Sequence, residues 1–148
     1  MDHITYRRAT TEDAAGISAL ILESQRQFCF YEFSEEGQRL MSELCGTKAI
    51  RHYISRGDVC FVAVCNGVAA AWHRRSISHR LWEMGRQECF CRGNKGYFNL
   101  RSSTYAIPVY EKWGFRRTGA ADMDHGITST PMELQVSTGM DQEIPSDA

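Results

Sequence analysis

The 148-residue sequence has no long hydrophobic run, no secretory leader pattern and no excess of positive charge. No apolar stretch approaches the roughly 20 residues that a helix needs to cross a bilayer. The opening residues 1–7 lack the apolar segment of a signal peptide. A formal net charge of −1 differs from the strongly basic balance of a general polyanion binder. We therefore expect a cytoplasmic protein that binds neither a membrane nor nucleic acid.

Two further absences concern metals and nucleic acids. The six cysteines have no paired C-x-x-C spacing of the kind that holds zinc, and Cys89 and Cys91 would point about 200° apart on a helix. Without a secretion signal, free thiols are expected, and no metal site. A nucleic-acid interpretation is disfavoured because the overall charge is nearly neutral and no exposed aromatic residues are interleaved with the residues that would carry it, Arg74, Arg75, Arg80, His73 and His79.

The length and the 43% hydrophobic content fit one compact domain. We assign residues 1–136 to this domain and residues 137–148, which mix Ser, Thr, Gly, Pro and acids, to a disordered tail. Helix signals predict helices near 12–27, 34–45, 47–56, 78–91 and 104–113. Strand signals predict strands at 4–7, 59–64, 68–72, 97–101, 115–118 and 127–136.

This element order predicts an α/β fold with a central, mixed but mostly antiparallel sheet flanked by helices. Asn66-Gly67 between two apolar runs is the strongest hairpin signal in the chain. The alternation of helices and strands in the C-terminal half favours a parallel pair at the sheet centre. Residues 122–126 are expected to form a polar turn. A proline is tolerated in an edge strand or among the first residues of a strand. We therefore expect either that the last strand lies at an edge of the sheet or that Pro131 is among its first residues.

The most informative segment is 97–115, which combines a short strand, a polar turn and a helix with a glycine stop. Ser102 or Ser103 can cap the helix start, and Pro108 lies near the first turn, where its missing N–H costs little. Gly114 is placed for the left-handed conformation that ends a helix. The segment therefore holds a helix with Tyr110 in a fixed position near the end of a strand.

Residues 102–115, with the pattern Ser-Ser-x-Tyr-Ala-x-Pro-Val-Tyr-Glu-Lys-x-Gly-Phe, resemble the acetyl-CoA-binding "motif B" of the GNAT (GCN5-related) N-acetyltransferases. Residues 4–14 are similar to the first strand and helix start of that family, so the resemblance spans 4–136. It implies an N-acetyltransferase that moves an acetyl group from acetyl-CoA to an amine by direct attack in a ternary complex. The acceptor would be a small molecule or a protein, and a homodimer is possible.

The resemblance implies that Tyr110 protonates the departing CoA thiolate. A phenol with an ordinary pKa near 10 is protonated at neutral pH and can donate a proton there. The other interpretation is a half-buried tyrosine that packs the helix on the sheet. Ser103 joins the cofactor-binding residues by the same resemblance.

The family's pyrophosphate loop aligns with residues 73–78, so Arg74, Arg75, Ser76, Ile77 and Ser78 are implied to bind the cofactor. Both family glycines are serine here, and a Cβ restricts how closely the backbone approaches a phosphate. The two arginines could compensate as charged phosphate ligands, or they could be solvated surface charges.

Only a few residues separate Trp72 from this loop, so one strand that is usual in the family is expected to be absent. That absence leaves a second hypothesis open: a catalytically impaired GNAT-like domain that acts as a binding module. Phe30, Tyr31 and Glu32 are implied to line the acceptor site, although the aromatic residues could equally be core. Glu32 is a candidate general base, whereas Glu111 is expected to be a surface charge.

Overall fold

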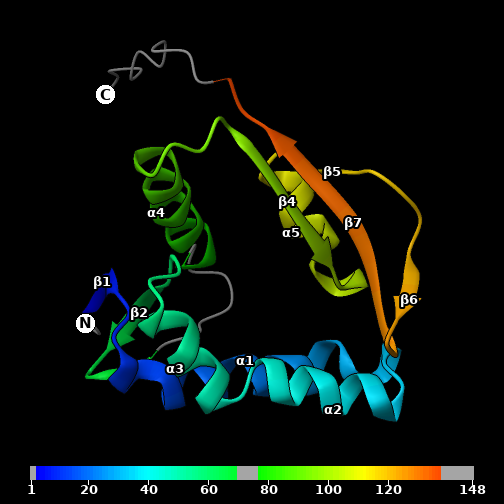
Figure 1. Ribbon diagram of the computed structural model, residues 1–148, viewed down its shortest axis with the longest axis horizontal. Helices are drawn as coiled ribbons and strands as arrows, with labels where there is room; N and C mark the ends of the chain where they lie inside the picture. Colours follow the sequence, from blue (N-terminus) through cyan, green and yellow to red (C-terminus); the bar gives the residue numbers. More distant parts are fainter. Residues whose placement is uncertain (1–2, 70–76, 138–148) are drawn as a thin grey trace.

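The structure, a computed structural model, describes residues 3–69 and 77–137, and all structural statements concern these residues (Figure 1). The α-helices are α1 (Ala14–Phe28), α2 (Glu35–Leu44), α3 (Thr47–Ser55), α4 (Ile77–Cys91) and α5 (Ile107–Lys112). Short 3-10 turns are η1 (Thr11–Asp13), η2 (Phe30–Glu32) and η3 (Thr104–Ala106). The strands are β1 (Ile4–Arg8), β2 (Phe61–Cys65), β3 (Val68–Ala69), β4 (Tyr97–Ser102), β5 (Arg116–Arg117), β6 (Asp122–Asp124) and β7 (Ile127–Gln135).

The described strands form two separate sheets. The first has the order β1-β2-β3, and the second has β4-β7-β5 with β6 paired to β7. The predicted α/β class with antiparallel strands flanked by helices is confirmed. The predicted parallel central pair is wrong for the described strands, because every pairing among them is antiparallel. The chain leaves β3 at Ala69 and next appears in α4, so no described strand joins the two sheets.

Figure 1 shows how the layers lie around these sheets. Helices α1, α2 and α3 lie along one side of the molecule, α4 stands beside the first sheet, and α5 lies against one face of β4 and β7. None of the described helices is long and apolar enough to cross a bilayer. The six cysteines are free thiols.

The first sheet confirms the hairpin predicted from Asn66-Gly67. Both turn residues have positive φ, 51° and 80°, and the strands pair directly before and after them through Cys65 and Val68. Such a turn matches the right-handed twist of the flanking strands. Val62 and Val64 on β2 are buried, together with Ala9, in one hydrophobic cluster.

The start of α1 is fixed by a charged capping arrangement around Asp13. Its carboxylate accepts hydrogen bonds from Arg7 at 2.7 and 2.9 Å, and from the Thr10 N–H and hydroxyl at 2.8 and 3.1 Å. The hydrogen bonds from Arg7, and then those from Thr10, lower the pKa of Asp13 below its usual value. These bonds tie β1 to the first turn of the helical layer.

Asp13 should therefore contribute to the acid stability of the fold. A carboxyl group whose pKa is lower in the folded state stabilises fully above its unfolded pKa of about 4. That contribution is lost as the pH falls from there through the folded pKa. We expect Asp13→Asn to lower the free energy of unfolding by about 1–2 kcal/mol at pH 7 and by much less at pH 2.5. Urea unfolding of parent, Asp13→Asn and Glu12→Gln at both pH values checks this, and an equal loss at both would contradict it.

The second sheet places β7 at its centre, so the expected edge position of the last strand is wrong. Pro131 is the fifth residue of β7 and pairs with Arg101 of β4. The Pro131 carbonyl accepts from the Thr118 N–H at 3.0 Å, just beyond the end of β5. The N and the C=O of one strand residue point toward the same neighbouring strand. The missing N–H of Pro131 therefore points toward the position just beyond the end of β5, where no further strand pairing is needed.

The segment expected to be a polar turn contains strand β6 as well. Asp122–Asp124 pair with β7, and the turn is the residue pair His125-Gly126, with φ values of 48° and 77°. The sequence of β6 lacks the alternation of apolar and polar residues that predicts a strand, because β6 is exposed throughout and pairs only with β7.

This tight turn holds α2 against the second sheet. The Ser34 N–H donates to the Gly126 carbonyl at 2.9 Å, and Gly37 is buried against the same carbonyl. A Cβ on Gly37 would lie 2.1 Å from the Gly126 oxygen, so only glycine fits. Leu44 is 44% exposed, because it lies at the last turn of α2, away from this contact.

Candidate active site

The predicted motif folds as expected around α5. The Ser103 hydroxyl caps the start by accepting from the Ala106 N–H at 3.4 Å, and Pro108 lies in the first turn. At the end, Gly114 has φ 94°, its N–H donates to the Glu111 carbonyl, and the Phe115 N–H donates to the Tyr110 carbonyl. This paired pattern is a Schellman motif, which places Phe115 back against Tyr110.

Tyr110 is half-buried on the face of α5 that meets the second sheet. Its ring lies edge-on to Trp113 and Phe115, with centroids 5.4 and 5.7 Å away. It packs against the cluster of Ile107, Phe115, Met132 and Leu134. Burial, and secondarily the nearby Cys29, raise the pKa of the Tyr110 phenol above its ordinary value. The phenol is therefore a protonated donor at neutral pH.

The end of α1 lies beside this helix. Phe28 stacks on Tyr105 with ring centroids 4.2 Å apart and an angle of 12° between the planes. Buried Cys29 follows Phe28 and is the group that lies near the Tyr110 phenol. No sequence pattern predicts this contact, because an isolated cysteine in an aromatic connector does not indicate which group it will face.

The start of α4 reaches the same neighbourhood. His79 in the first turn lies edge-on to Trp113 with centroids 6.0 Å apart, and Trp82 stacks on Trp113 at the same distance. Trp82 also contacts Phe98 of β4 at 5.2 Å. Three elements thus converge around Tyr110 and Trp113: the end of α1, the first turn of α4, and the whole of α5.

The predicted pyrophosphate ligands fall into two groups. Arg74, Arg75 and Ser76 lie outside the described residues. Ile77 is buried, so its side chain packs inside and only its backbone can serve a ligand, while Ser78 is exposed. The first turn of the 15-residue helix α4 carries no acidic residue, so the positive end of its dipole is left for an anion.

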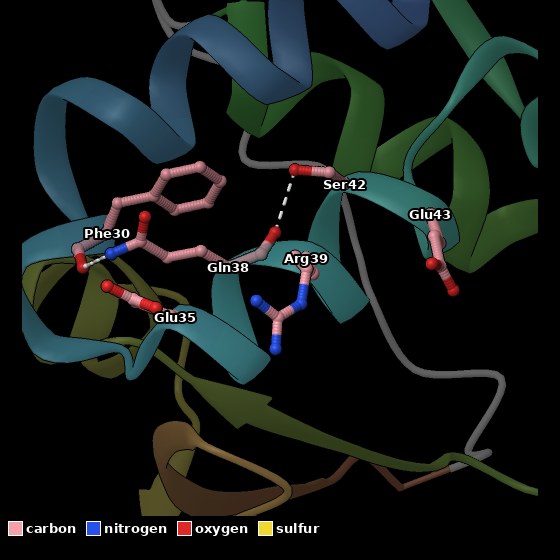
Figure 2. A pocket seen from close by; sticks show the side chains of 6 residues that line it. All are labelled: Phe30, Glu35, Gln38, Arg39, Ser42 and Glu43. Atoms are coloured by element: carbon pink, nitrogen blue, oxygen red, sulfur yellow. Dashed lines mark hydrogen bonds between the residues drawn. The ribbon is translucent and has the colours of Figure 1, made fainter.

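The predicted acceptor residues Phe30, Tyr31 and Glu32 form η2, directly after α1. Phe30 lines a surface cavity of about 530 Å³ with residues of α2 (Figure 2), namely Glu35, Gln38, Arg39, Ser42 and Glu43. In that cavity the Gln38 amide donates to the Phe30 carbonyl at 3.0 Å. Tyr31 is 74% exposed, whereas Oε2 of Glu32 is buried.

Tyr110 lines neither the cavity at Phe30 nor those at Phe61 and at Gly16. The described residues thus bring Tyr110 near Cys29 and against Trp113, which His79 contacts, but Tyr110 does not line the cavity at Phe30. The Ser103 hydroxyl oxygen accepts the hydrogen bond that caps the helix start.

Two charged residues near the motif form ion pairs away from Tyr110. Glu111 is exposed and pairs with Arg117 at 3.0 Å, in agreement with the expected surface role. Arg101 donates to the Ser129 hydroxyl at 2.8 Å and pairs with Asp122. Arg101 therefore holds the β6 hairpin. Within residues 3–69 and 77–137, no three His, Cys, Asp or Glu side chains gather as a possible metal site.

The comparisons with known proteins agree with this geometry. Residues 65–136 match the family model of the acetyltransferase (GNAT) domain. The chain is similar to the crystal structure of a GCN5-related N-acetyltransferase from Rhodopseudomonas palustris, with TM-score 0.71 and 18% identity over 92% of this chain and 98% of that one. The comparison with curated proteins gives no match.

Two further solved structures share the fold. The PaiA N-acetyltransferase from Thermoplasma acidophilum, in complex with coenzyme A, matches with TM-score 0.70 and 16% identity over 90% of this chain and 99% of that one. A GNAT-family acetyltransferase from Streptococcus pneumoniae matches with TM-score 0.64 and 16% identity over 90% and 100%.

The fold and the matched domain define an acetyltransferase-type α/β protein. The fold is that of the GNAT acetyltransferases, and residues 65–136 match the model of that domain, as the motif around Tyr110 predicts.

Proposed function

We propose that the protein is an N-acetyltransferase that moves the acetyl group of acetyl-CoA to an amine by direct attack in a ternary complex. The observation that carries this proposal is the protonated, half-buried Tyr110 phenol where α1, α4 and α5 of a GNAT fold converge. The similarity to a relative whose structure holds coenzyme A supports an acyl-CoA as the donor. The absence of a membrane-spanning segment among the described helices is compatible with a cytoplasmic enzyme.

The reaction itself requires one donor group from the protein. Acetyl-CoA supplies a thioester whose C–S bond breaks as the C–N bond to the amine forms, and the amine's surplus proton passes to water. Tyr110 gives its phenolic proton to the departing sulfur, which would otherwise leave as a thiolate. Burial keeps this proton on the phenol, so the hydroxyl is available as a donor to the sulfur as negative charge develops there, and the phenolate then regains a proton from water.

The residues at the start of α4 are suited to hold the pyrophosphate. In any α-helix the N–H groups of the first turn have no partner within the helix, and together with the positive end of the dipole they favour an anion. The exposed side chain of Ser78 adds a hydroxyl donor there. Arg74, Arg75 and Ser76, which precede the described part of this helix, would add charge-assisted contacts. Trp82 fixes the helix through its stacking on Trp113, so the anion site and Tyr110 keep a constant separation.

The acceptor in this proposal is an amine of a small molecule or of a protein, received near η2. Phe30 and Tyr31 offer aromatic surface there, and the cavity at Phe30 carries the carboxylates of Glu35 and Glu43. Aromatic faces and carboxylates are the groups that attract a cationic amine.

Acetyl-CoA binding should raise the melting temperature of the intact chain. A ligand present at a hundred times its dissociation constant stabilises by about 2.7 kcal/mol. For a chain of this size, that corresponds to roughly 5–10 °C. A thermal shift assay with acetyl-CoA measures it, and ATP at equal concentration is the control for nucleotide binding alone. No shift at millimolar acetyl-CoA would contradict the proposal and favour the binding-module hypothesis.

A further inference from the structure

The outer side of α1 forms one wall of an apolar groove. The groove has a volume of about 490 Å³ and lies between α1 and strand β3. Glycine, alanine and aliphatic side chains line most of it, namely Gly16, Ala19, Leu20, Leu22, Val68 and Ala69. Val68 is 67% exposed. Exposed apolar surface that is bordered by charged residues marks a site of interaction with another molecule.

Helix α1 carries apolar residues on its outer side as well as on its inner side. Ala14 is buried on the inner side, and Ile17 packs against the hydrophobic cluster of β2. On the outer side Ala19 is exposed, while Leu20 and Leu22 are only partly buried. A helix on the surface of a monomer normally directs polar residues outward. The outer side of α1 is therefore suited to contact a protein surface.

The middle of the groove allows a second helix to approach closely. A Cβ on Gly16 would lie 3.4 Å from the Cβ of Ala69, so α1 crosses β3 at this point. Ala19 follows almost one turn further along the same side of the helix. These small residues leave a depression between the ridges formed by Leu20 and Leu22, and ridges of a facing helix pack into such depressions.

Charges of opposite sign lie at the two ends of this side of α1. Glu12, in the turn before α1, is exposed and forms no ion pair among the described residues. Arg26, in the last turn, is exposed and contacts Glu23 at 3.7 Å, a surface pair that contributes little. Glu12 and Arg26 lie seven positions before and after Ala19, which is about two turns in each direction. The surface is therefore complementary to itself in the antiparallel orientation.

We propose that this groove is the interface of a homodimer, in which the α1 helices of two copies pack antiparallel about a two-fold axis at Ala19. Residues at equal distances from such an axis face each other. Gly16 then receives the partner's Leu22, and Arg26 pairs with the partner's Glu12. Each contact occurs twice, so both charged ends are paired and the apolar middle is covered. The inference is independent of acetyl transfer, because neither α4 nor Tyr110 takes part in it.

Other registers of the two helices match less well. An axis one turn later, at Glu23, would set two carboxylates against each other and would place Arg26 opposite the partner's Leu20. An axis one turn earlier, at Ala15, would carry Arg26 beyond the start of the partner's helix. The axis at Ala19 alone among these three pairs Arg26 with a carboxylate.

Sedimentation equilibrium of the full chain, from about 10 μM to about 1 mM, tests the proposal. We expect the parent to form a dimer in this range. Ala19→Arg should weaken the dimer at least about a hundredfold, because it sets two cations against each other at the axis. Ser24→Arg is the matched control, since Ser24 is exposed on α1 but does not line the groove. This control should dimerise within about twofold of the parent.

A charge exchange tests the register. Arg26→Glu should weaken the dimer about tenfold, because two attractive pairs become repulsive, and Glu12→Arg should act in the same direction. The combination of both changes should restore the parent's affinity within about threefold. Lys48→Glu makes the same charge change as Arg26→Glu at an exposed position of α3, outside the groove, and should have no effect.

Three results would overturn the proposal. A parent that stays monomeric at the highest concentration would leave the groove to a partner other than a second copy. A dimer that tolerates Ala19→Arg would use another surface. A combined charge exchange that fails to restore the dimer would refute the antiparallel register. Melting temperatures in dilute solution verify that the variants are folded, and Ala19→Arg and Arg26→Glu should change them little, because both positions are exposed.

Discussion

Tyr110→Phe is expected to lower kcat for acetyl transfer by about 10²–10⁴-fold, the range of a lost general acid. The expected loss follows from geometry and charge. The phenol is the titratable group that α5 directs toward the convergence of α1 and α4, and burial holds it protonated. Phenylalanine keeps the ring contacts with Trp113 and Phe115, so the fold and the affinity for acetyl-CoA should change little. Release of free CoA thiol, with saturating acetyl-CoA and an amine, measures the effect.

Tyr105→Phe is the matched control for this experiment. Tyr105 lies on the same short helical segment, is about half exposed, and stacks on Phe28 through its ring and not its hydroxyl. Its loss of a hydroxyl should leave kcat within about twofold of the parent. Equal rates for Tyr110→Phe and the parent would remove Tyr110 from its assigned role.

Gly37→Ala is expected to lower the free energy of unfolding by about 2–3 kcal/mol or more. The added methyl would lie 2.1 Å from the Gly126 oxygen and 2.4 Å from its carbonyl carbon. Backbone atoms cannot turn away as a side chain can, so α2 must move off the β6–β7 turn, as in other overpacked sites. The Ser34–Gly126 hydrogen bond would be strained with it. Urea unfolding of the variant measures the loss.

Gly85→Ala supplies a control of opposite sign. Gly85 lies in the interior of α4, and an added methyl group would have no described atom within 4 Å beyond its own helix backbone and chain neighbours. Alanine is the better helix former there by about 1 kcal/mol, so this variant should be slightly more stable than the parent. If both glycine variants were stabilised, the close approach of α2 to the turn would be wrong.

The features that the sequence predicts well are those that neighbouring residues decide. Asn66-Gly67 sets its own turn by tolerating positive φ, and Ser103, Pro108 and Gly114 define the two ends of one short helix without help from distant parts. The family motif rests on the same local run, and its expected helix and glycine stop are present.

The features that the sequence predicts poorly depend on contacts between distant residues. The missing N–H of Pro131 favours an edge strand, yet the short β5 leaves room for this proline at the sheet centre. The approach of Gly37 to Gly126 and of Cys29 to Tyr110 joins residues more than 80 positions apart.

A crystal structure of the chain with acetyl-CoA tests the central claim most directly. We predict that the pyrophosphate lies at the first turn of α4 and that the thioester sulfur lies within about 3.5 Å of the Tyr110 hydroxyl, the reach of a hydrogen bond to sulfur. A structure in which the cofactor binds elsewhere, with the Tyr110 hydroxyl still covered by its apolar neighbours, would contradict the account.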